Sequence, residues 1–89
     1  MFRKYKGMRL TYDKQGYIYF FCRNFSALSP ENKRRVTDAC ARIAGEEADV
    51  LLALLTGRKS ARHLSLTRYI SEGRLYRWRR EFFESFDVH

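Results

Sequence analysis

Arginine is the residue type in this chain best suited to chemistry, and it is concentrated in the C-terminal third. Between residues 58 and 80 there are eight basic residues, seven of them arginine, against a single acid, Glu72. The planar guanidinium group donates paired hydrogen bonds to a phosphate or to a guanine edge. The segment therefore predicts contacts with nucleic acid, and double-stranded DNA is the first candidate. Its basic residues are Arg58, Lys59, Arg62, Arg68, Arg74, Arg77, Arg79 and Arg80.

The charge of the whole chain supports this prediction. Eighteen Lys and Arg against ten Asp and Glu give a net charge of +8 on 89 residues. A field of this strength on so small a body favours polyanions as partners. A chain of this length forms one small domain, which argues against a large substrate-binding enzyme.

Other chemistries find no support in the residue spacing. His63, Cys22 and Cys40 lie too far apart in sequence for the short ligand spacing of zinc sites. The acids at 46–49 have no histidine or nucleophile near them and suit the start of a helix. There is no phosphate-binding loop and no hydrolase motif. We expect no enzyme activity, no metal and no cofactor.

Apolar runs and cysteine usage indicate an intracellular chain. The longest apolar runs, 17–22 and 50–55, have six residues each, whereas a membrane span needs about 20. The basic N-terminus is not followed by the apolar region of a secretory signal. We expect a cytoplasmic protein that makes no membrane contact, with Cys22 and Cys40 as buried free thiols.

Two capped helices are needed to position the arginines. Ser60 and Ser71 are suitable N-caps, the first for a short helix and the second for a helix that runs to about Phe86. A helix-turn-helix needs a small residue where its helices cross, an apolar residue in the turn, and apolar residues that hold down the second helix. These roles fall on Ser65, Ile70, Leu75 and Trp78.

The same segment carries a family resemblance. Ile70 and Ser71, followed by the Leu-Tyr-Arg-Trp run at 75–78, resemble the recognition-helix pattern of transposases, resolvases and other homeodomain-like or sigma-region-4-like regulators. The resemblance covers little more than residues 60–80. It departs from the pattern at Tyr69, where glycine is common, and at Arg68, which is usually apolar. Together with the N-terminal half, the chain also looks similar to short proteins of bacterial phages and mobile elements.

That resemblance implies a docking mode in which the last helix enters the major groove. The residues opposite its apolar stripe then face the bases, and other basic and capping residues meet phosphates. The N-terminal Arg3, Lys4, Lys6 and Arg9 would follow the backbone or a minor groove. The expected base contacts are Glu72, Gly73, Tyr76, Arg77 and Arg80. The expected phosphate contacts are Ser71, Arg58, Lys59, Arg62, Arg68, Arg74 and Arg79.

The N-terminal half predicts a β-hairpin and two core helices. Residues 8–23 alternate β-formers around an Asp13–Gly16 turn signature, which indicates a hairpin. Period-2 alternation places Tyr17, Tyr19 and Phe21 on one face, as a surface for a partner, for a second copy of the chain, or for stacked single-stranded bases. Residues 29–57 predict two helices, with inward stripes at Val36, Cys40 and Ile43 and at Ala48, Leu51, Leu52 and Leu55.

These inferences combine into an α+β fold in one domain, 1–89. It holds a β-hairpin (8–23), two core helices (29–57) and a helix-turn-helix (60–86). The first hypothesis is a DNA-binding protein of a phage or mobile element, a transcriptional regulator or recombination accessory, acting as a homodimer that contacts two half-sites. The alternative is a small inhibitor of a host defence complex, similar in role to an anti-CRISPR, that contacts a host protein or ribonucleoprotein.

Overall fold

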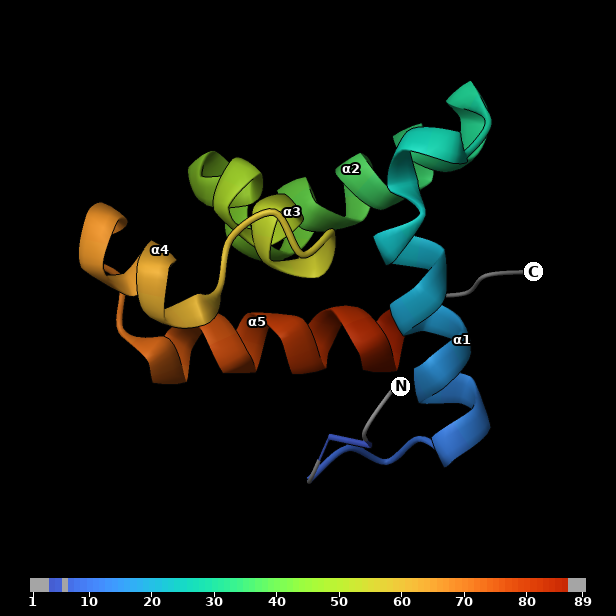
Figure 1. Cartoon of the computed structure of the whole chain (residues 1–89), viewed down its shortest axis with the longest axis horizontal. Helices are drawn as coiled ribbons and strands as arrows, with labels where there is room; N and C mark the ends of the chain where they lie inside the picture. The colour runs from blue at the N-terminus through green and yellow to red at the C-terminus, as the bar shows by residue number, and fades with distance from the viewer. Residues whose placement is uncertain (1–3, 6, 87–89) are drawn as a thin grey trace.

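The computed structural model describes residues 4–5 and 7–86, and it is helical (Figure 1). Among these residues there is no strand. The predicted α+β class, with a β-hairpin at 8–23, is therefore wrong. The helices are α1 (Tyr12–Arg23), α2 (Pro30–Ala44), α3 (Ala48–Leu55), α4 (Ala61–Arg68) and α5 (Glu72–Ser85), with short 3-10 turns at Phe25–Ala27 and Gly45–Glu47.

Helix α1 replaces the expected hairpin because a helical pattern underlies the same residues. Thr11 is the N-cap, and its hydroxyl accepts a hydrogen bond from the Lys14 amide at 3.2 Å. Gln15, Ile18 and Cys22 are buried, at the spacing of three and four that one helix face requires. The β-propensity of the tyrosines and phenylalanines is overridden by packing of this face.

The helix also separates the three aromatic residues expected on one face. Residues two apart point in nearly opposite directions on a helix, so Tyr19 cannot share a face with Tyr17 or Phe21. Phe21 packs toward Phe86, with ring centroids 5.7 Å apart, whereas Tyr17 is 58% exposed. These three residues therefore do not share the strand face on which they were predicted.

The two central helices form as the sequence predicts. Ser29 caps α2, Pro30 occupies its first turn, and Gly45 ends it with a φ of 57°. Val36 and Cys40 of α2 are buried. Helix α3 buries Val50, Leu51, Leu54 and Leu55, while the expected Leu52 is half-buried.

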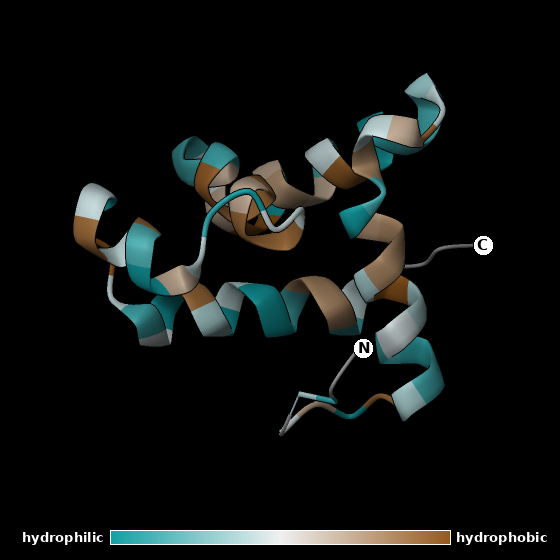
Figure 2. Cartoon of the chain, viewed as in Figure 1, coloured by the Kyte–Doolittle hydropathy of each residue, from teal (hydrophilic) through white to brown (hydrophobic). Residues whose placement is uncertain are grey.

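Helix α5 runs lengthwise below α2 and α3 in the view of Figure 1, and the core lies between them. Helices α2 and α3 lie on one side of it, α4 lies beside its start, and α1 crosses near its end. The apolar block of α3 faces α5, and the link after α3 is hydrophilic (Figure 2). Leu75, Trp78, Phe82 and Phe83 of α5 are buried against this block.

The described part of the N-terminal segment is bound to the helices. The buried Gln15 side chain accepts a hydrogen bond from the Tyr5 amide at 2.8 Å and donates one to the Leu10 carbonyl at 3.1 Å. The Arg9 amide donates to a Glu84 carboxylate oxygen at 3.1 Å. This stretch is therefore not the free arm that its basic residues suggested, and Arg3 and Lys6 lie outside the described residues.

Candidate functional site

A short turn, residues 69–71, joins α4 to α5. Tyr69 adopts a left-handed backbone, with φ 58° and ψ 41°, and its amide donates to the Ser65 carbonyl at 3.1 Å. It is the one non-glycine residue with positive φ in the described chain. Tyrosine adopts this left-handed conformation at a cost of about 1 kcal/mol.

The predicted caps and apolar anchors hold the two helices in place. The Ser60 hydroxyl accepts from the His63 amide and the Ser71 hydroxyl from the Arg74 amide, both at 3.1 Å. Beneath the turn, Ile70 is 4% exposed. Leu64 of α4 and Leu75 of α5 are also buried.

The outer face of α5 carries two exposed arginines and a glycine beside the N-terminal segment. Gly73, Arg77 and Arg80 follow one another at a spacing of four and three, and all are exposed. We call these three residues the outer row. Neither arginine forms an ion pair within the described residues. The outer row is thus exposed along two turns of helix, with Tyr5 and Met8 of the N-terminal segment at its side.

Glu72 and Tyr76 flank the outer row and are joined to each other. The Tyr76 hydroxyl donates to a Glu72 carboxylate oxygen at 3.1 Å. Partial burial, and then this bond to Glu72, raise the pKa of Tyr76, which keeps its hydroxyl protonated. Together with the outer row, these two residues make up the five expected base contacts, and all five are exposed on one side of α5.

Three of the residues expected to contact phosphates are instead engaged within the chain. Arg68 pairs with Asp49 at 2.8 Å, and this bond lowers the pKa of the Asp49 carboxyl. Arg74 lies 3.5 Å from Glu47 and stacks over Trp78 at 4.8 Å. Arg79 is half-buried, with its guanidinium 3.8 Å from the centre of the Tyr5 ring.

The other four expected phosphate contacts are exposed. Ser71 stands at the start of α5, and Arg58, Lys59 and Arg62 surround the start of α4. The link that carries two of them is rigid, because the amides of Arg58 and Lys59 both donate to the Ala53 carbonyl, at 3.0 and 3.4 Å. These three basic side chains and the two arginines of the outer row are the exposed cations of the candidate interface.

Sequence reasoning missed a second cationic cluster, in which Arg23 of α1 and Arg79 of α5 lie beside Tyr5 and Tyr19. Its members come from segments far apart in the chain. No spacing in the sequence marks them, and the burial of Arg79 depends on the tertiary fold.

No group of three or more His, Cys, Asp or Glu residues that could hold a metal ion occurs in the part of the chain that the structure describes. None of the described helices is long and apolar enough to cross a membrane. Known protein-family models, curated proteins and solved structures contain no match to this chain.

Proposed function

We propose that this chain binds double-stranded DNA and inserts α5 into the major groove as the recognition helix of a helix-turn-helix. The observation that carries the proposal is the outer row on a helix set by the left-handed turn at Tyr69. Arg77 and Arg80 offer guanidinium forks toward base edges, and Gly73 lets the DNA backbone approach closely.

The cations around the start of α4 complete the interface. Arg58, Lys59 and Arg62 are exposed beside the amides of the first turn of α4, and both groups suit phosphate oxygens. Arg68 pairs with Asp49 of α3, and Arg74 lies beside Glu47 of the preceding 3-10 turn, so both arginines are partly neutralised within the fold. One copy reads few bases, so we propose that two copies bind adjacent half-sites, in a regulatory or recombination role.

Duplex binding by matched variants tests this function. The measurement is fluorescence anisotropy of a labelled duplex, after selection from a random-sequence pool has identified an enriched motif. Arg77→Ala should weaken binding to that motif by about fivefold or more, since a good bidentate base contact discriminates by about 1–3 kcal/mol. Arg42→Ala, at an exposed arginine of α2, is the control and should change affinity less than twofold.

Circular dichroism must show that both variants remain folded. Equal losses from Arg77→Ala and Arg42→Ala would mean that the charge as a whole, and not α5, attracts DNA. Absence of duplex binding by the unaltered protein would overturn the proposed function.

A further inference from the structure

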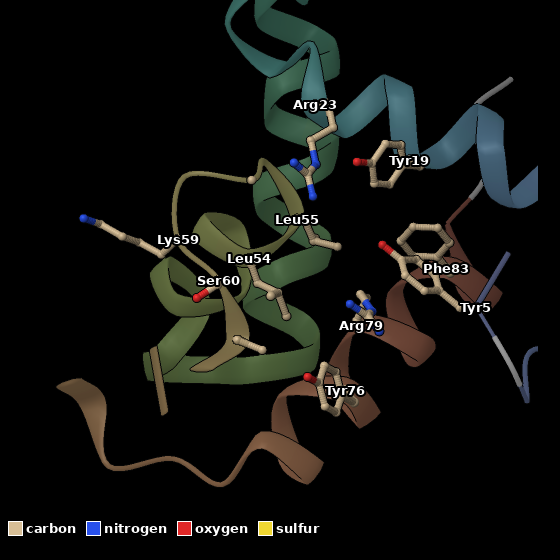
Figure 3. A pocket seen from close by; sticks show the side chains of 12 residues that line it. Tyr5, Tyr19, Arg23, Leu54, Leu55, Lys59, Ser60, Tyr76, Arg79 and Phe83 are labelled. Carbon is tan, nitrogen blue, oxygen red and sulfur yellow. The ribbon is translucent and has the colours of Figure 1, made fainter. Parts of the chain in front are cut away.

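A pocket of about 320 Å³ opens where the N-terminal segment, α1, the link after α3 and α5 meet (Figure 3). Its floor is apolar and consists of Leu54, Leu55, Ala61 and Phe83, all of which are buried. Its rim is aromatic and cationic. The rim residues are Tyr5, Tyr19, Tyr76, Arg23 and Arg79.

Both rim arginines are held in place by aromatic rings. The Arg23 guanidinium lies 4.6 Å from the centre of the Tyr19 ring, and that of Arg79 lies 3.8 Å from Tyr5 and 4.9 Å from Tyr76. Stacking on rings occupies the faces of a guanidinium and leaves its in-plane N–H groups available to an anion. The rings thus fix the orientation of the two guanidinium groups that line the pocket.

The positive charge of these arginines is not balanced nearby. Within the described residues neither Arg23 nor Arg79 forms an ion pair, and no carboxylate lines the pocket. Arg79 Nε is covered by neighbouring atoms and has no hydrogen-bond partner among the described residues. The two guanidinium groups are therefore positive charges that an anionic ligand in the pocket would balance.

The neighbouring groups are arranged for the same ligand. Burial raises the pKa of Tyr5 although the charges of Arg79 and Arg23 oppose the shift, so its hydroxyl stays protonated. The Arg23 guanidinium lies directly over Gly57, in the link after α3. The Lys59 side chain extends away from the pocket (Figure 3).

We propose that this pocket binds a nucleoside monophosphate unit, with its base over the apolar floor and its phosphate between Arg23 and Arg79. The apolar floor suits the face of a base, and guanidinium forks suit a phosphate. The pocket lies at the lower end of the volume range of small-molecule sites, which fits one nucleotide. The unit is either a free nucleotide or the unpaired terminal nucleotide of a strand. The site does not depend on duplex binding by the outer row.

Calorimetric titration of the full chain tests the proposal. The titrants are the four nucleoside 5′-monophosphates, their nucleosides and inorganic phosphate. At least one monophosphate should bind ten or more times tighter than its nucleoside and than inorganic phosphate. Binding by none of the four, or equal binding of the monophosphate and either fragment, would overturn it.

Matched variants locate the site. Arg23→Gln should weaken binding of the monophosphate at least tenfold, and Arg42→Gln, which removes one charge from α2 outside this pocket, should change it less than twofold. Arg79→Lys, which keeps the charge but loses the fork, serves as a second variant should Arg23→Gln unfold. Equal weakening by Arg42→Gln and the pocket variants would contradict the location.

Two further titrants identify the source of the nucleotide. A 5′-phosphorylated duplex with a one-nucleotide overhang is compared with a blunt duplex. A preference for the overhang that Arg23→Gln abolishes supports a strand end, and equal binding of the two supports a free nucleotide. Arg77→Ala should leave monophosphate binding unchanged, so failure of duplex recognition and failure of this site are distinguishable.

Discussion

At the residue scale, the left-handed backbone of Tyr69 sets the direction in which the chain leaves α4 and enters α5. A left-handed backbone costs a residue with a Cβ about 1 kcal/mol or more, and Tyr69 is 93% exposed, so its ring recovers little of this by burial. The strain persists because the caps and the buried Ile70 fix the turn from both sides.

Tyr69→Gly should therefore raise the free energy of unfolding by about 1 kcal/mol, because glycine adopts this conformation without a Cβ penalty. Urea denaturation followed by circular dichroism measures the change. Tyr69→Ala removes the ring and keeps the Cβ, so it should give no such gain. Equal stabilisation by the two variants would show that the ring, and not the backbone, carries the cost.

The cysteine thiols provide a second prediction at this scale. Burial raises the pKa of Cys22 and of Cys40 to about 12, and at Cys22 nearby Cys40 adds to the effect. Because the folded pKa values lie above the unfolded ones, stability is fully present below pH 9 and is lost as pH rises toward 12.

Urea denaturation should thus show a lower free energy of unfolding at pH 10.5 than at pH 8, with part of the difference removed in Cys40→Ala. Both thiols should also resist alkylation in the native protein at pH 8. Stability that stays constant between these pH values would contradict the burial of the thiols.

At the element scale, Gln15 joins the N-terminal segment to α1. Its side chain is fully buried and makes two hydrogen bonds to backbone groups of residues 5 and 10. Replacing a buried hydrogen-bonding group leaves its partners without bonds, which costs about 1–3 kcal/mol.

Gln15→Leu should therefore destabilise the fold by about 2 kcal/mol and speed hydrogen exchange at the amide of Tyr5, whose bond it removes. The exposed Lys14, which precedes Gln15 on the same helix, supplies the control. Lys14→Leu should leave that exchange rate unchanged. Exchange at Tyr5 that is the same in Gln15→Leu and in the unaltered protein would contradict the role of Gln15.

The elements that were predictable from sequence are those with explicit end signals. Ser29, Ser60 and Ser71 each cap the helix expected after them, and Leu75 and Trp78 of α5 are buried as expected. Helix α1 was missed because Gly16 and the β-forming aromatics suggested a turn between strands. Its signal was the Thr11 cap with Gln15, Ile18 and Cys22, but a buried glutamine is not recognisable as a core position before its backbone partners are known.

At the scale of the whole molecule, charge placement determines how the chain meets a polyanion. The sequence shows that most of the net charge of +8 lies in one basic segment, residues 58–80. The division of that segment into outward, paired and inward arginines was not predictable, because Asp49, Glu47 and Tyr5 approach it only in the folded chain.

This division predicts a moderate salt dependence of duplex binding. Within residues 58–80, the exposed cations without an ion pair are Arg58, Lys59, Arg62, Arg77 and Arg80. If they meet phosphates or bases, the logarithm of affinity should fall with the logarithm of salt concentration at a slope of about −3 to −5. Anisotropy titrations between 50 and 300 mM salt measure it, and a slope near zero would argue against phosphate contacts.

The most direct test of the central claim is an amide chemical-shift map of the labelled protein with and without a DNA duplex. The proposed docking predicts the largest shift changes at Gly73, Arg77 and Arg80 and around residues 58–62, with α2 unaffected. Changes confined to α1 or α2, or no changes at saturating duplex, would contradict α5 as the recognition helix.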